Sequence, residues 1–173
     1  AVSKWRSGGW PDARVAINVS AQQFVTGNFL ADIERLLARH GLPPDAIELE
    51  LTETMLQTGA VTVEALHGLR MLNVDTALDD FGTGYSSLAY LRRFPFDTLK
   101  IDRSFVRELM SRRDARAFVK MIIGLAQTLR MRTVAEGVEE PAQASVLARY
   151  GCLELQGHLI ARAMPAAAVV GCD

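Results

Sequence analysis

Short strand-like runs and longer helical repeats alternate along the whole chain. Six short runs have the length and the apolar or alternating pattern of β-strands. They cover residues 15–19, 47–52, 74–78, 98–102, 133–136 and 153–156. Between these runs, apolar residues recur every three or four positions, as they do on the buried face of an amphipathic helix. Strands that alternate with helices predict βαβ units and a parallel sheet.

Glycine and proline mark the ends of the predicted helices. Gly41 and Gly151 each follow a helical repeat as a C-cap, and Pro141 stands at a helix start. Gly27-Asn28 divides the helical stretch after the first strand into two. After the last strand, Pro165 and the Ala-Val run that follows it predict a terminal helix.

Within two residues of the end of each predicted strand stands a side chain that can coordinate a metal ion or polarise a bond. These side chains are Asn18, Glu50, Asp79 with Asp80, Lys100, Glu136 and Gln156. A barrel of parallel strands brings all its carboxyl ends to one face, so the six groups would converge there. A doubly wound sheet would spread them along an edge and would carry a glycine-rich phosphate turn, which Gly82-Thr83-Gly84 does not match. The pattern therefore favours an α/β barrel of the TIM type.

The adjacent carboxylates of Asp79 and Asp80 follow a buried apolar run. Neighbouring carboxylates repel each other, and burying them is costly without a cation or hydrogen-bond donors nearby. Oxygen-rich sites of this kind suit hard divalent ions such as Mg²⁺ or Mn²⁺. The alternative is an ordinary Asp turn in which one carboxylate caps the next helix.

The converging oxygens suit a site with two metal ions. Asn18, Glu50 and Asp79 supply ligands for one ion, and Asp79 with Asp80 could bridge to a second. Two such ions clamp the attacking and leaving oxygens of a phosphodiester and lower the pKa of a bound water. Each residue alone also fits a structural role, such as a hydrogen bond at a strand end or a solvated alternating position.

The remaining strand-end groups suit catalytic and supporting roles. Lys100 is a fixed cation suited to the charge on a phosphorane or on the nucleophilic water. Glu136 is a candidate ligand of the second ion or a general base. Gln156 could orient a metal-bound water. Lys100 as a surface lysine and Glu136 as a turn carboxylate are the corresponding structural alternatives.

Composition limits the function classes. The chain has 173 residues, 49% hydrophobic residues and a formal net charge of −1. This favours one domain, and no overall basic field draws the chain to DNA, RNA or anionic lipid. Cys152 and Cys172 lack metal-ligand spacing and are interpreted as reduced thiols of a cytoplasmic protein. No apolar run is long enough to span a membrane, no signal peptide is visible, and the missing initiator Met suggests a piece of a longer protein.

Six motifs carry a resemblance to a known family. In chain order they are Asn18-Val19-Ser20, Glu50-Leu51-Thr52-Glu53, Asp79-Asp80-Phe81-Gly82-Thr83-Gly84-Tyr85-Ser86-Ser87-Leu88, Lys100-Ile101-Asp102-Arg103-Ser104-Phe105-Val106, Ala135-Glu136-Gly137-Val138-Glu139 and Gln156-Gly157. Together they resemble the EAL family of cyclic di-GMP phosphodiesterases. The resemblance implies a modified TIM barrel whose first strand is antiparallel, two Mg²⁺ or Mn²⁺ ions, and hydrolysis of cyclic di-GMP to linear pGpG.

Carried over by motif, Asn18, Glu50, Asp79, Asp80 and Glu136 look like metal ligands, and Lys100 looks like the contact of the nucleophilic water. Glu53 looks like the anchor of the loop after Asp80, which in this family orders the metal site and helps to form a dimer interface. Glu139 and Gln156 look like supporting groups around the metals.

The chain also departs from the family pattern. The Glu-Ala-Leu segment, with its metal-binding Glu and the substrate-binding Arg that follows it, is absent, and six strands are two short of a closed barrel. Leu153 stands where the family usually has Asp, and Ile160-Ala161-Arg162-Ala163-Met164 differs from the usual Phe-Ser-Arg-Pro-Leu. We therefore expect residues 1–173 to form the central and C-terminal part of an EAL domain. Alone, this piece should be poorly soluble or self-associated, and inactive on cyclic di-GMP.

Two rival functions remain open from the sequence. The first is a catalytically silent EAL-like domain that acts as a receptor for cyclic di-GMP or as a protein-interaction module. The second is an unrelated barrel enzyme acting on a small phosphorylated substrate. The resemblance further implies fusion to regulatory or GGDEF-type modules in the full protein, and a homodimer.

Overall fold

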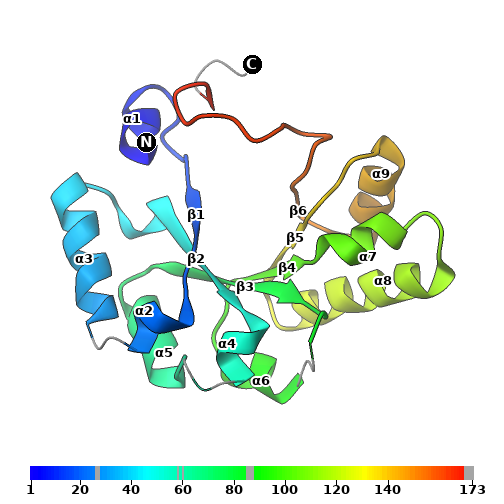
Figure 1. Ribbon diagram of the computed structural model, residues 1–173, viewed down its shortest axis with the longest axis horizontal. Helices are drawn as coiled ribbons and strands as arrows, with labels where there is room; N and C mark the ends of the chain where they lie inside the picture. The colour runs from blue at the N-terminus through cyan, green and yellow to red at the C-terminus, as the bar shows by residue number, and fades with distance from the viewer. Residues whose placement is uncertain (26–27, 58, 60, 85–87, 170–173) are drawn as a thin grey trace.

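The computed structural model of the chain describes residues 1–25, 28–57, 59, 61–84 and 88–169. Its centre is one sheet of six strands, in the order β1-β2-β3-β4-β5-β6, and each neighbouring pair is parallel. The strands are β1 (Val15–Asn18), β2 (Ile47–Thr52), β3 (Asp75–Phe81), β4 (Thr98–Ile101), β5 (Arg132–Ala135) and β6 (Glu154–Leu155). The sheet curves into a half-barrel with helices along its outer side (Figure 1). The predicted α/β class and TIM-type arrangement are confirmed.

The helices lie between the strands in chain order. They are α1 (Val2–Ser7), α2 (Ala21–Val25), α3 (Phe29–His40), η1 (Pro44–Ala46), α4 (Glu53–Gln57), α5 (Val63–Met71), α6 (Leu88–Arg93), α7 (Arg103–Glu108), α8 (Arg113–Thr128) and α9 (Pro141–Tyr150). Gly41 and Gly151 end α3 and α9 in the left-handed conformation, as the sequence predicts. Of the described helices, none is both long and apolar enough to cross a bilayer.

The hydrophobic core lies between the sheet and its helices. Leu49, Leu99 and Ile101 are fully buried on the strands, and Ile122 and Ile123 are fully buried on α8. Helix α8 packs against β4 and β5. Burial of such side chains contributes about 1.5–3 kcal/mol each. Successive side chains of a strand point to opposite faces. The residues that alternate with this apolar set therefore face the inside of the half-barrel, where polar side chains can lie.

The interior is charged at the amino ends of the strands. Six polar side chains meet there: Arg14, Glu48, Asp75, Thr98, Arg132 and Glu154. Arg132 Nη2 lies 3.0 Å from Glu48 Oε1 and 2.7 Å from Asp75 Oδ2. The Thr98 hydroxyl donates to the buried Glu48 Oε1 at 2.6 Å. A buried carboxylate needs such partners, so this end of the interior is held by its own ion pairs.

The strands begin and end within about two residues of the predicted limits, except β3, which continues to Phe81. Both Asp79 and Asp80 therefore lie inside the strand and not beyond its end. Helix α4 was not predicted, because five residues are too few to show a helical period. Where the sequence predicts a terminal helix, residues 166–168 form a turn and residue 169 has 3₁₀ geometry, while residues 170–173 lie outside the described part.

The segment after β6 runs back toward the start of the chain (Figure 1). The Trp5 indole Nε1 donates to the Ala166 carbonyl at 3.2 Å. Gly157, at the start of this segment, has φ +156°, and a Cβ at this position would come within 2.2 Å of the Val138 carbonyl oxygen. The backbone at Gly157 thus passes directly against the loop after β5.

Gly157→Ala should lower the free energy of unfolding by about 2–4 kcal/mol, because the new methyl group would overlap backbone that cannot yield. Gly124→Ala is the matched control. A Cβ at Gly124 on α8 meets nothing within 4 Å, so this change should stabilise the helix by about 0.5–1 kcal/mol. Chemical denaturation of both variants checks the pair. Equal stability of the two variants would contradict the close approach at Gly157.

Candidate active site

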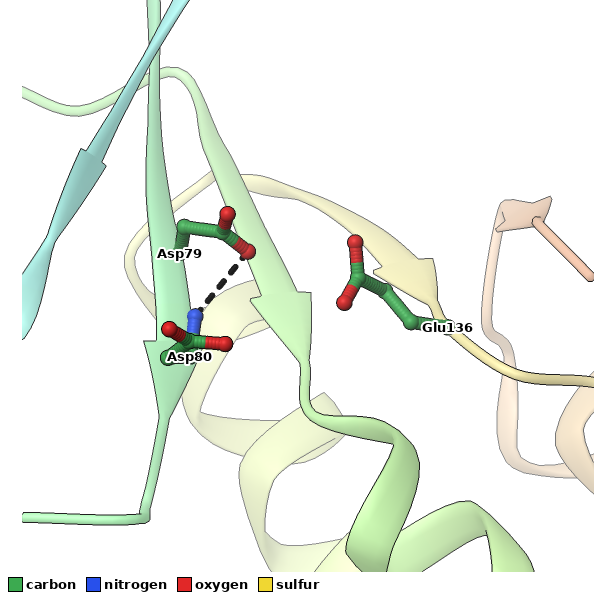
Figure 2. A group of neighbouring side chains, drawn as sticks. All are labelled: Asp79, Asp80 and Glu136. Carbon is green, nitrogen blue, oxygen red and sulfur yellow. Dashed lines mark hydrogen bonds between the residues drawn. The ribbon is translucent and has the colours of Figure 1, made fainter. Parts of the chain in front are cut away.

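Two consecutive aspartates of β3 share one site because the strand is irregular there. In a regular strand, neighbouring side chains point to opposite faces. Here the β3–β4 register shifts between Leu78 and Phe81, and Asp80 has φ +55°. Such a bulge redirects a side chain. The Asp79 and Asp80 carboxylates consequently lie together, and the Asp80 amide donates to Asp79 Oδ1 at 3.0 Å (Figure 2).

Glu136, which follows β5, completes this acidic group. Ligand oxygens of Asp79, Asp80 and Glu136 all lie within 4.8 Å of one another. The carboxylates of Asp79 and Glu136 face each other across the end of β4 (Figure 2). The predicted convergence of the ends of β3 and β5 is thus present. Three carboxylates at this separation have the donor chemistry that Mg²⁺ or Mn²⁺ prefers.

The buried ammonium of Lys100 stands among these carboxylates. Lys100 Nζ lies 2.6 Å from Glu50 Oε1, 3.1 Å from Asp79 Oδ1 and 2.6 Å from Glu136 Oε1. Lys100, on β4, is only 5% exposed. Burial by itself would lower the pKa of Lys100, but its hydrogen bonds to Glu136 and Glu50 raise that pKa far above the usual lysine value. Lys100 is therefore a fixed cation over the physiological pH range.

The carboxylates outnumber this cation. Burial raises the pKa of Glu136, and the charges of Asp79 and Glu50 act in the same direction, against the opposing effect of the Lys100 ammonium. Burial and the neighbouring Asp79 also raise the pKa of Asp80. Four carboxylates, those of Glu50, Asp79, Asp80 and Glu136, surround the one ammonium of Lys100, so the group carries an excess of negative charge. A divalent cation at this position would relieve that excess.

The predicted site residues on and after β1 and β2, which are Asn18, Glu50 and Glu53, differ in burial and in their contacts with this group. Glu50 is buried and bound to Lys100. Asn18 is exposed at the end of β1 and pairs in register with Glu50, so their backbones are adjacent. Glu53 is buried at the first turn of α4, immediately after β2. The segment that Glu53 was predicted to anchor includes residues 85–87, which lie outside the described part of the chain.

Glu139 and Gln156 line a cavity of about 680 Å³ beside the acidic group, which Asp80 and Glu136 also line. Glu139 is exposed, with an oxygen 3.8 Å from His158 Nδ1. The backbone N–H of Gln156 donates to the Ala135 carbonyl at 2.8 Å. Both residues thus line the cavity that adjoins the acidic group.

The cavity is also lined by polar residues to which the sequence analysis assigned no role. These are Asp102, Arg103, Arg107, Gln143, His158 and Arg162. The spacing of the two α7 arginines was a usable signal, because residues four apart on a helix that starts at a strand end share a face. No such signal pointed to Gln143 or His158, because their place depends on how α9 and the segment after β6 fold over the sheet.

Fold and site together define an α/β-barrel domain with an acidic site at the carboxyl ends of its strands. The chain belongs to the EAL domain family, since the family profile described as "EAL domain" matches residues 1–163. The bifunctional diguanylate cyclase/cyclic di-GMP phosphodiesterase MucR of Pseudomonas aeruginosa is 44% identical over 163 residues, which is 94% of this chain. The chain spans 24% of the length of MucR.

Solved structures show the same arrangement. The phosphodiesterase PaMucR in complex with c-di-GMP has a TM-score of 0.90 and 42% identity, over 96% of this chain and 68% of that chain. A manganese/cy-diGMP complex of Klebsiella pneumoniae BlrP1 has a TM-score of 0.80 and 29% identity, over 91% of this chain and 41% of that chain. Family and fold thus agree with the resemblance carried by the six motifs.

The acidic group predicts measurable cation binding. Asp80→Asn should weaken Mn²⁺ binding by at least about ten-fold, because it removes one charged ligand from the group. Asp12→Asn, the same change at an exposed position before β1, should leave the Mn²⁺ affinity unaltered. Calorimetric titration of the two purified variants with Mn²⁺ checks this. Superimposable titrations would remove Asp80 from the cation site.

Proposed function

We propose that the chain forms the catalytic face of a metal-dependent phosphodiesterase that hydrolyses cyclic di-GMP to linear pGpG. The observation that carries this proposal is the acidic group of Asp79, Asp80 and Glu136 around Lys100. Membership of the EAL family supports it. So do the names of similar proteins, which are a cyclic di-GMP phosphodiesterase and a phosphodiesterase complexed with c-di-GMP.

The proposed cofactors are two Mg²⁺ or Mn²⁺ ions. Asp79, Asp80 and Glu136 would hold them, with Glu50 and Asn18 contributing from the adjacent strands. The excess of carboxylates over ammonium supports this donor set. When bound, such ions lower the pKa of a water molecule and neutralise charge on a phosphodiester. The manganese complex of BlrP1 is consistent with this metal chemistry.

The protein side chains have separate roles in this proposal. Lys100 keeps its proton, so it acts as a fixed positive charge toward the attacking water and not as a base. Glu136, directly after β5, would serve as a ligand of the second ion or as a general base. Glu53 would anchor the loop after Asp80. Glu139 and Gln156 would orient groups around the metals from the cavity wall.

The chain spans only part of the length of the proteins that it resembles. We propose that residues 1–173 are the central and C-terminal part of an EAL domain and that further strands complete the barrel. Fusion to regulatory or GGDEF-type modules would match the bifunctional name of MucR. A homodimer and a cytoplasmic location of the catalytic face belong to the same proposal.

Asp79→Asn in a protein that contains the complete domain should reduce pGpG formation by at least about 100-fold at saturating Mn²⁺, because the central ligand loses its charge. Asp12→Asn should retain the wild-type rate. Initial rates measured by chromatography of the products decide the outcome. Cyclic di-GMP that binds to the wild-type protein without being cleaved would instead support the receptor function.

Lys100→Ala should lower kcat by about 100-fold or more, while the Kd for cyclic di-GMP changes only a few-fold. A group directed at charge that develops in the transition state contributes mainly to kcat. Calorimetry for Kd and steady-state kinetics for kcat on the same preparation separate the two effects, with thermal denaturation as the control for folding. A large loss of affinity with an intact kcat would make Lys100 a substrate-binding group.

A further inference from the structure

The cavity beside the acidic group has charges of opposite sign on two sides. Asp80 and Glu136 form part of its wall near β3 and β5, whereas Arg103 and Arg107 face it from α7. Residues four apart on a helix project to the same side, so the two guanidinium groups lie along one wall. Arg162, from the segment after β6, also lines the cavity.

Arg103 is held close to the acidic group. Gly137, directly after Glu136, has φ +66°, and a Cβ there would come within 2.6 Å of Arg103 Cβ. The backbone that carries Glu136 therefore passes directly against the first residue of α7.

Gln143 fixes the position of α7, which carries the side of the cavity formed by Arg103 and Arg107, here called the arginine wall. Its side chain is buried, and its Oε1 accepts hydrogen bonds from the backbone N–H groups of Glu139 at 2.8 Å and Glu140 at 2.9 Å. Its Nε2 donates to the carbonyl of Val106, the neighbour of Arg107, at 3.2 Å. One side chain thus joins the loop after β5 to α7, and the wall is built before any ligand arrives.

Arg103 and Arg107 have no counter-ion among the described residues. Neither forms an ion pair within 4.0 Å there, in contrast to Arg112, which pairs with Asp114 and Glu108. Asp102, the sequence neighbour of Arg103, accepts a hydrogen bond from the Ser104 N–H as the N-cap of α7, and Glu108, the neighbour of Arg107, pairs with Arg112. The two guanidinium groups are therefore available to an anion that enters the cavity.

We propose that Arg103 and Arg107 bind the second, uncleaved phosphodiester of the cyclic dinucleotide while the acidic group acts on the first. This inference rests on the proposed function. A cyclic dinucleotide carries two phosphodiesters on one ring, and the one outside the metal site would otherwise face carboxylates. Arginine pairs with phosphate through two parallel hydrogen bonds, so the wall would orient the ring and favour substrates with two phosphates.

Arg107→Ala in a protein that contains the complete domain tests this. With cyclic di-GMP, KM should rise roughly 10–100-fold and kcat should change by less than about three-fold, as expected for loss of a charge-assisted hydrogen bond that is equally strong before and during reaction. With bis(p-nitrophenyl) phosphate, which has a single phosphodiester, kcat/KM should fall at least ten times less. Arg107→Lys should lie between the wild type and Arg107→Ala.

Arg149→Ala is the matched control, because Arg149 is exposed on α9 and does not line the cavity. It should leave both substrates unaffected. An unchanged KM for cyclic di-GMP in Arg107→Ala, or an equal loss with both substrates, would overturn the proposal. Calorimetric Kd values in Ca²⁺ separate the two proposals. Wild-type protein that binds cyclic di-GMP in Ca²⁺ but does not cleave it in Mn²⁺ would contradict hydrolysis, and the Arg107→Ala Kd would still test the subsite. Wild-type protein that does not bind it would overturn both.

Discussion

A single buried ammonium group organises the carboxyl-end face of this sheet. Lys100 on β4 contacts carboxylates from β2, from β3 and from the residue after β5. Buried carboxylates are costly unless they are paired, so Lys100 allows them to stand side by side. The arrangement requires parallel strands in chain order, because only then do the ends of β2, β3 and β5 all lie close to β4. The acidic site is therefore a direct consequence of the topology.

The two ends of the half-barrel interior differ in the number of carboxylates for each positively charged side chain, and this difference suits them to different roles. At the amino ends, two guanidinium groups pair with three carboxylates, and the buried Glu48 carboxylate is contacted by Arg14, Arg132 and the Thr98 hydroxyl. At the carboxyl ends, one ammonium faces four carboxylates: Glu50, Asp79, Asp80 and Glu136. The first layer holds strands together, while the second retains the negative charge that a divalent cation requires.

The sequence predicted most of the fold and the acidic site, because both depend on strand ends. Strand periodicity located all six strands, and the side chains at their ends were Glu50, Asp79, Lys100 and Glu136. It could not show that β3 runs through Asp80, since the bulge depends on the pairing with β4. The arginine wall was also missed: Gln143 holds it through contacts between segments far apart in the chain.

Anomalous scattering from crystals of the complete domain grown with Mn²⁺ tests the central claim most directly, because it locates the ions independently of any activity. The account predicts manganese peaks bound by the carboxylates of Asp79, Asp80 and Glu136, at the metal–oxygen distances expected for hard divalent ions. Manganese peaks only at other positions, with none at these three carboxylates, would contradict the account.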